Sequence, residues 1–232
     1  MKIKILAHTP EPEKLIAAAA KLCYSSSPVD EIMDGLTSES VEKFLTKLVD
    51  MGHESPTEHV SFTFMIDGVS RALLAQITRH RLASFSVRSQ RYVNEEGFQY
   101  VIPEKIKNHN EFANNSFHGL MSYLDDAYTY FVNSLKESGL TNEQANEQAR
   151  AVLPNACATS IVMTMNAREL MHFFNKRCCN RAQDEIRSVA NEMLRQCKEV
   201  APILFKNAGA PCVKGYCPEG SMSCGALKND NN

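Results

Sequence analysis

Hydrophobic residues alternate with polar or small ones along three stretches of the chain, which is the spacing of half-buried β-strands. Residues 2–7 and 59–66 alternate most regularly. Residues 84–92 place small or polar side chains between apolar ones and predict an extended segment. Residues 158–165 are apolar and β-branched, which predicts a buried strand.

Elsewhere, apolar residues recur every three or four positions, and capping residues mark where helices begin. Thr141 with Gln144 has the sequence of a capping box, and Asn166 with Glu169 has the same spacing. The predicted helices cover residues 11–23, a segment from Ser38 or Ser40 to Gly52, and residues 69–78, 120–139, 141–154, 166–176 and 186–200. Because strands and helices follow each other without regular βαβ order, we expect an α+β fold. Its mixed or antiparallel central sheet would be flanked by long helices.

Length and composition favour one soluble domain. The chain has 232 residues, 44% of them hydrophobic, which is enough for a sizeable core. We expect a single domain at residues 1–208, followed by an irregular, cysteine-containing tail at residues 209–232. No apolar run approaches the roughly 18 residues of a membrane span, and the apolar start is too short for a signal peptide. We therefore expect a cytoplasmic protein without a membrane partner, whose eight cysteines are reduced thiols or ligands.

Positive charge is concentrated in one segment of a slightly acidic chain. Residues 68–94 contain five arginines and no Asp or Glu, whereas the whole chain has a net charge of −2. All eleven arginines lie within residues 71–91 or 150–195. Guanidinium groups bind phosphate and carboxylate bidentately, which lysine does not do. The pattern favours an anion site over a solvated basic face, and the acidic net charge argues against a nucleic-acid partner.

Other interpretations of single residues are weaker. Ser89 as a nucleophile lacks an adjacent base, because His80 is nine residues away. His53 and His59 are six residues apart with a proline between them, which suits neither a helical nor a strand pair of metal ligands. We therefore predict no metal site.

The cysteines give no clear function. Cys212, Cys217 and Cys224 are separated by four and six residues and lack the Cys-x2-Cys pair of a zinc knuckle. Cys178 and Cys179 are adjacent, which is poor geometry for an ordinary disulfide, and are expected to be core thiols. A thiol-based metal or redox sensor in the tail stays open as an alternative.

The arginine segment also carries a family signature. Arg79-His80-Arg81, seven residues and then Ser89 resembles the highly specific RHR-x7-S signature of the flavin-dependent thymidylate synthases. Three further blocks, at residues 53–59, 150–154 and 166–186, resemble the family as well. The resemblance covers the chain from about residue 52 to residue 187.

The resemblance implies reductive methylation of dUMP to dTMP. Methylenetetrahydrofolate would donate the carbon, reduced FAD the hydride, and NADPH would reduce the flavin again. The protein would bind dUMP and folate and supply orientation and electrostatics. The family fold is α+β and forms a homotetramer whose active sites are built from several subunits.

The resemblance also assigns residues to two ligands, position by position. FAD would contact His53, Ser55, Arg79, His80, Arg81, Val87, Asn166, Ala167, Arg168 and His172. The nucleotide dUMP would contact Gln76, Ile77, Thr78, Arg79, Val87, Arg88, Ser89, Gln90, Arg91, Arg150 and Arg177. Ser89 and Arg91 would serve the phosphate. Arg177 would be the activating residue, because a fixed cation beside the uracil stabilises negative charge that develops on the ring.

The chain departs from the family at two positions, and one other function stays open. Val87 stands where some members carry a glutamate, and Arg181 where some carry a histidine. The alternative is a non-catalytic nucleotide- or RNA-binding protein that stacks bases on Phe85 and Tyr92.

Overall fold

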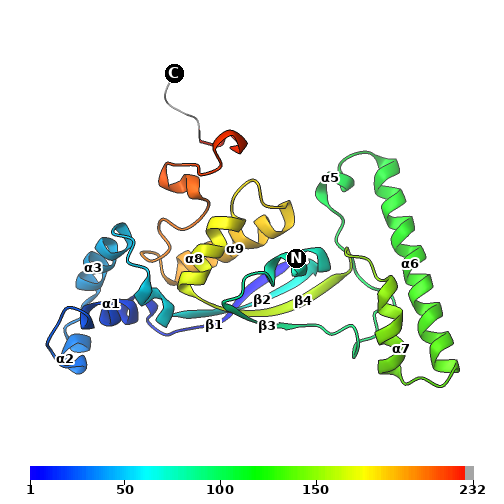
Figure 1. Ribbon diagram of the computed structural model, residues 1–232, viewed down its shortest axis with the longest axis horizontal. Coiled ribbons are helices and arrows are strands. Elements are labelled where there is room, and N and C mark those ends of the chain that lie inside the picture. The colour runs from blue at the N-terminus through cyan, green and yellow to red at the C-terminus, as the bar shows by residue number, and fades with distance from the viewer. Residues whose placement is uncertain (228–232) are drawn as a thin grey trace. The chain divides into compact units, whose positions relative to one another are not determined.

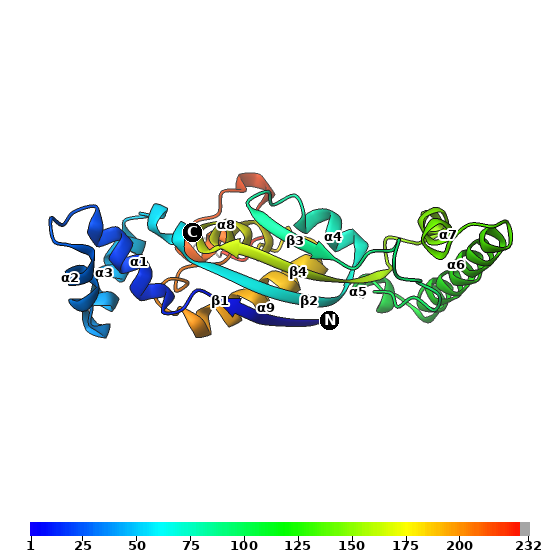
Figure 2. The same ribbon diagram turned by 90° about the horizontal axis from the view of Figure 1, so that it is seen from below.

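The computed structural model describes residues 1–227 and has an α+β fold built on a four-stranded antiparallel sheet (Figure 1). The sheet order is β1-β2-β4-β3, and Figure 2 shows the four strands side by side. The strands are β1 (Lys2–His8), β2 (Ser61–Ser70), β3 (Ala83–Val87) and β4 (Ala158–Asn166). The three alternating stretches and the apolar, β-branched stretch therefore each contain a strand.

The helices confirm most of the periodic segments. They are α1 (Pro12–Leu22), α2 (Val29–Asp34), α3 (Ser38–Asp50), α4 (Arg71–Ile77), α5 (Glu104–Lys107), α6 (Glu111–Glu137), α7 (Asn142–Ala149), α8 (Ala167–Arg177) and α9 (Asp184–Val200). The short helices α2 and α5 were not predicted, because four to six residues are too few to show a helical period. The remaining turns are the 3-10 segments η1 (Ser55–His59), η2 (Arg150–Val152), η3 (Pro211–Lys214) and η4 (Gly220–Met222).

Several boundaries differ from the sequence-based expectation: α6 begins at Glu111 and not near Leu120, and α7 ends at Ala149, so that Arg150 opens η2. The cap of α3 is Thr37, not Ser38 or Ser40, and Thr37 and Ser40 form a reciprocal capping box. The extended segment after residue 83 ends at Val87. Strand β2 continues to Ser70, whose hydroxyl accepts a hydrogen bond from the Leu73 N–H at 3.1 Å and starts α4 there.

The pairing of β2 with β4 fixes the register of the sheet. The hydroxyls of Thr63 and Thr164 are hydrogen-bonded at 2.9 Å, and the Ser160 hydroxyl donates to Asp67 Oδ1 at 2.5 Å. The position numbers of both pairs sum to the same value, as antiparallel pairing requires. The alternate residues of both strands are buried and apolar: Phe62, Phe64, Ile66, Ile161, Met163 and Met165. One face of the sheet therefore belongs to the core.

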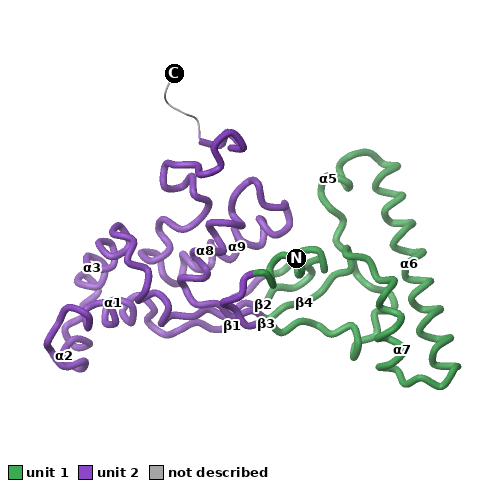
Figure 3. Tube along the Cα trace, viewed as in Figure 1, with its two compact units in different colours: residues 1–2, 66–79, 85–162 green, residues 3–65, 80–84, 163–232 purple. Residues whose placement is uncertain are grey.

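The chain divides into two compact units, and the division runs through the strands (Figure 3). Unit 1 comprises residues 1–2, 66–79 and 85–162, and unit 2 comprises residues 3–65, 80–84 and 163 onward. In unit 1, α6 packs beside α7 around Tyr128, Val132, Ala145 and Ala149. The unit 1 core therefore lies mainly between helices.

Unit 2 has a core of aromatic and aliphatic side chains. The Phe62 and Phe205 rings meet edge to face at 5.6 Å, and Phe174 contacts Phe205 at 6.0 Å. Helix α9 is tied to β1 by Gln196, whose amide accepts from the Ile5 N–H and donates to the Ile3 carbonyl. Within the described residues, no helix combines the length and apolar character needed to cross a bilayer.

Candidate functional site

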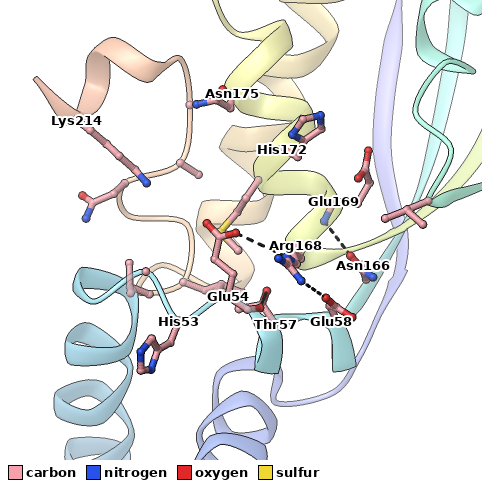
Figure 4. Close-up of a pocket in the computed structure, with 18 residues that line it drawn as sticks. His53, Glu54, Thr57, Glu58, Asn166, Arg168, Glu169, His172, Asn175 and Lys214 are labelled. Carbon is pink, nitrogen blue, oxygen red and sulfur yellow. Dashed lines mark hydrogen bonds and ion pairs between the residues drawn. The ribbon is translucent and has the colours of Figure 1, made fainter. Parts of the chain in front are cut away.

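Unit 2 contains a cavity of about 700 Å³, which is within the size range of small-molecule sites. Its walls come from the loop after α3, from η1, from α8 and from the tail (Figure 4). The polar lining side chains include His53, Glu54, Glu58, Asn166, Arg168, Glu169, His172, Asn175 and Lys214. The cavity therefore joins segments that are more than 100 residues apart in the sequence.

Arg168 carries the fixed positive charge of this cavity. It lies in the first turn of α8, where the Asn166 side chain caps the helix by accepting from the Glu169 N–H at 2.8 Å. Arg168 forms an ion pair with Glu58 and approaches Glu54 Oε2 at 3.7 Å. The hydrogen bond that Arg168 donates to the Glu58 carboxylate raises the pKa of Arg168. These exposed pairs add little stability, but they hold the guanidinium against the cavity wall.

A hydrogen-bonded chain of three residues lies beside the cavity. His80 and Glu169 are both more than nine-tenths buried, and His80 Nδ1 lies 3.0 Å from Glu169 Oε1. Arg177, the last residue of α8, donates from Nε to His80 Nε2 at 3.2 Å. Because Nε2 accepts this bond, the His80 proton must lie on Nδ1, from which it is donated to Glu169.

His80 is thus held as a neutral imidazole. Burial is the main cause that lowers its pKa, and the nearby Arg177 and His172 lower it further, whereas Glu169 acts in the opposite direction. The Phe173 ring contacts the imidazole edge to face, with ring centroids 5.0 Å apart. The result is a fixed acceptor that orients the Arg177 guanidinium.

Most of the predicted FAD residues fall in unit 2. His53, Asn166, Arg168 and His172 line the cavity, Ser55 opens η1, and Arg81 is exposed. The Ala167 side chain is fully buried, so only its backbone is available to a ligand. Arg79 and Val87 belong to unit 1.

The cavity also contains residues that the sequence did not mark. The sequence predicts only a helix-start position for Glu169, although its side chain reaches His80 across 89 positions. Lys214 belongs to the tail, which the family signature does not cover. No local pattern distinguishes either residue from an ordinary surface charge.

Unit 1 contains the arginine-rich region. Arg91 forms ion pairs with two carboxylates of α7. Its Nε lies 2.9 Å from Glu147, and its Nη2 lies 2.9 Å from Glu143. Arg71 donates to the Arg88 carbonyl at 2.8 Å, and burial lowers its pKa. These two arginines therefore already have protein partners.

Three arginines of this unit have a different environment. Arg79, Arg88 and Arg150 are exposed, and no carboxylate of residues 1–227 lies within ion-pair distance of them. An unpaired guanidinium at a surface is suited to bind an anionic ligand. Arg88 and Arg150 are both predicted to bind the nucleotide, and the positive charge of each lowers the pKa of Arg71. They therefore lie in the same region although 62 positions separate them.

The neutral donors of this region are held by the backbone. The Ser89 hydroxyl oxygen accepts from the Arg91 N–H at 3.2 Å, which leaves its hydrogen to donate elsewhere. The Gln90 amide donates to Cys157 Sγ at 3.6 Å. At the end of α4, the Ile77 side chain is fully buried, Gln76 is half-buried and Thr78 is exposed. The Ser89 bonding pattern suits a donor to phosphate.

A buried carboxylate lies under the arginines of unit 1. Glu95 is 7% exposed, and burial raises its pKa, although the positive charges of Arg71 and Arg88 oppose the shift. Burial is the main cause that raises the pKa of Cys157 to about 11, and the negative charge of Glu95 also raises it. Cys157 is therefore a protonated core thiol at neutral pH. Among residues 1–227, no three His, Cys, Asp or Glu side chains are grouped so that they could hold a metal ion.

Comparison with known proteins identifies one family. The model of the family described as "Thymidylate synthase complementing protein" matches residues 4–203. The chain is 52% identical to the flavin-dependent thymidylate synthase of Clostridium tetani over 97% of its own length and 93% of that protein. It is 49% identical to the protein of the same name from Geobacter sulfurreducens, over 97% and 94% of the two lengths. Its identity to the Pyrococcus horikoshii protein of that name is 39%, over 98% and 94%.

Proposed function

The chain belongs to the flavin-dependent thymidylate synthase family, and from that premise we propose which of its residues serve each ligand. It is an enzyme that makes dTMP from dUMP by reductive methylation, with FAD as its flavin. When bound, the reduced flavin supplies the hydride, methylenetetrahydrofolate the carbon, and NADPH the electrons that restore the flavin. The protein must then orient these partners and stabilise charge on the uracil.

We assign the FAD to the cavity of unit 2. The cavity offers a cation fixed by two carboxylates, Arg168, and a second cation, Lys214, both suited to phosphate oxygens. The His53 and His172 imidazoles and the apolar side chains of Leu82 and Met171 suit a flavin ring and its polar edge. This donor set and the volume of about 700 Å³ support the assignment.

We assign dUMP to the arginine region of unit 1. Arg79, Arg88 and Arg150 would bind the nucleotide, because no carboxylate of the described chain neutralises them. The Ser89 hydroxyl would donate to the phosphate, since its oxygen already accepts from the backbone. Arg91 would act from its position between Glu143 and Glu147, where it shapes the site more than it neutralises charge.

Arg177 would stabilise the negative charge that develops on the uracil ring. A guanidinium is always charged in a protein, so it acts as a fixed cation and not as a base. Its Nε–H bond to His80 fixes the plane of the group before the substrate arrives. Such preorganisation means that the protein need not reorganise as charge appears.

Glu169 would be a positioning residue for Arg177. Its bond to His80 Nδ1 selects the tautomer whose Nε2 accepts from Arg177. Without this carboxylate, the buried imidazole would lose its partner and could rotate or change tautomer. The single observation that supports this role is the buried Glu169–His80–Arg177 chain.

We further propose a cytoplasmic homotetramer. Helix α6 carries exposed apolar side chains along its length: Phe112, Leu120, Tyr123, Tyr130 and Phe131. Exposed apolar stripes of this kind mark protein interfaces. All eight cysteines are free, which suits a reducing compartment.

Purified protein tests the proposal directly. It should be yellow or take up FAD, and the flavin should be reduced by NADPH in the presence of dUMP. Complete turnover requires dUMP, methylenetetrahydrofolate, FAD and NADPH, with dTMP measured as the product. A colourless protein that ignores FAD but binds single-stranded RNA with strong salt dependence would contradict the proposal and favour the nucleic-acid alternative.

A further inference from the structure

Five of the eight cysteines line one small cavity of unit 2, apart from the FAD cavity. Its volume is about 80 Å³. The lining cysteines are Cys178, Cys179, Cys212, Cys217 and Cys224. The first two follow α8 directly, and the other three belong to the tail, so the fold brings together thiols that the sequence left unexplained.

Polar contacts hold the tail against the end of α8. Arg181 forms an ion pair with Glu219, and the Asn180 amide donates to Cys224 Sγ at 3.6 Å. Both contacts join the loop after α8 to residues of the tail. These contacts fix the tail beside the cavity at Glu219 and at Cys224.

The thiols of this cavity are not equivalent. Cys224 is exposed, and hydrogen bonds from the Ala226 backbone and the Asn180 side chain to its sulfur lower its pKa. Cys178 is half-buried, and burial raises its pKa to about 12. Cys224 is thus an accessible sulfur that accepts hydrogen bonds, and four other thiols line the same cavity. In such an arrangement one cysteine can attack a disulfide and another can resolve the product.

We propose that this cavity is a thiol–disulfide site, in which Cys224 attacks a small disulfide and a second lining cysteine closes an intrachain disulfide. The Cys224 thiolate attacks one sulfur of RSSR, which forms a mixed disulfide and releases RS⁻ that takes up the Cys224 proton. The second cysteine loses its proton, attacks Cys224 Sγ and releases the other RS⁻, which takes up that proton. Two protein thiols are oxidised, and one RSSR is reduced to two RSH.

The position of the site suggests what it regulates. Cys178 is the residue after Arg177, and Cys212 lies in the same 3-10 turn, η3, as Lys214 of the FAD cavity. A disulfide from Cys224 to Cys178 would tie the tail to the end of α8, and one to Cys212 would tie the residues after η4 to η3. The thiol chemistry stands independently, whereas its effect on turnover rests on the proposed function.

The test uses the full-length, reduced protein and oxidised glutathione as the probe. Mass spectrometry should find an intrachain disulfide that joins Cys224 to one of the other four lining cysteines. Cys224→Ser should abolish this product, and the matched control Cys23→Ser, which removes an exposed thiol of α1's C-terminal end, should leave it unchanged. No FAD or dUMP is present, so the result is separate from the proposed function.

A second measurement addresses the environment of Cys224. Below neutral pH, iodoacetamide should alkylate Cys224 at least about fivefold faster than Cys23, and Asn180→Ala should reduce that advantage. Equal reactivity, a disulfide formed only between chains, or a stoichiometric thiophilic metal that blocks the thiols of protein purified without chelator would each overturn the proposal. Effects on turnover are then read by comparing the oxidised and reduced enzyme. A turnover failure in both forms would count against the proposed function and not against the thiol site.

Discussion

The unit 2 cavity to which we assign FAD and the arginine region of unit 1 use the same side chain in opposite ways. In unit 2, Arg168 is paired with carboxylates, and the Nε of Arg177 is bonded to a neutral histidine. In unit 1, Arg79, Arg88 and Arg150 are exposed and meet no carboxylate of the described residues. Hydrogen bonds to the protein fix the orientation of a guanidinium group. A guanidinium without a protein counter-ion can instead form its ion pair with a bound ligand. The difference separates arginines that orient from arginines that bind.

The largest expected effect comes from removing the orienting cation. Arg177→Ala should lower the rate of dTMP formation by about 10²–10³-fold, because one preorganised charge is lost at the uracil. The flavin absorbance should stay largely intact, since the FAD cavity keeps its lining. Arg195→Ala is the control, because Arg195 is an exposed arginine of α9 paired with Glu192 and Glu199. Wild-type turnover by Arg177→Ala would refute the activating role.

Variants of Glu169 test whether the orientation of the Arg177 guanidinium depends on the hydrogen bonds that link Glu169, His80 and Arg177. Glu169→Ala should lower kcat by up to about 100-fold, because the His80 tautomer and the Arg177 plane are no longer fixed. Glu169→Gln keeps an oxygen acceptor and should restore most of that loss. Urea unfolding of both variants separates orientation from stability, since Ala also leaves a buried N–H unsatisfied. If both variants lost activity equally, charge and not geometry would be the cause.

A crossed pair of arginine variants tests the separation of the two regions. Arg150→Gln should raise the KM for dUMP about tenfold or more and leave FAD binding unchanged, because a hydrogen bond to a charged group is lost. Arg168→Gln should weaken FAD binding and leave dUMP affinity of the FAD-saturated enzyme nearly unchanged. Titrations of FAD fluorescence and of dUMP-dependent turnover measure the two affinities. Effects on the opposite ligand would remove the distinction between the regions.

Ser89 provides a smaller effect within unit 1. Ser89→Ala should weaken dUMP binding by about fivefold, the value of one ordinary neutral hydrogen bond, and leave turnover at saturating dUMP measurable. Ser84→Ala, in the same segment, is the matched control. Complete loss of turnover with unchanged dUMP affinity would instead return Ser89 to the role of nucleophile.

The smallest expected effect is a pH dependence that belongs to unit 2. Because the folded pKa of His80 is lowered, the native imidazole stays neutral at pH 7 and is protonated only below about pH 6.5. Protonation removes the acceptor for Arg177, so kcat should fall on the acid side. Stability should fall there as well, because the unfolded chain takes up this proton first as the pH decreases. Glu169→Gln should move the acid limb to lower pH, since Glu169 raises the His80 pKa. If the acid limb of the kcat profile did not move, a group other than His80 would be responsible for it.

The sequence alone determined the local elements of this enzyme. Alternation located three strands and an apolar, β-branched run located the fourth, and Thr141 with Gln144 forms the predicted capping box. Asn166 caps α8 as expected. The RHR-x7-S spacing identified the family that the comparisons then showed. These signals are readable because each depends on neighbours within one helical turn or on the period of one strand.

Only the tertiary structure decided which distant polar groups meet. Glu169 has the spacing of a capping-box residue, but its carboxylate bonds to His80 instead. Arg91, assigned to phosphate from the signature, lies between two glutamates of α7. The five cysteines of the small cavity come from two separate segments. A buried or half-buried polar group needs a partner because desolvation is costly, and packing, not sequence distance, determines which partner is within reach.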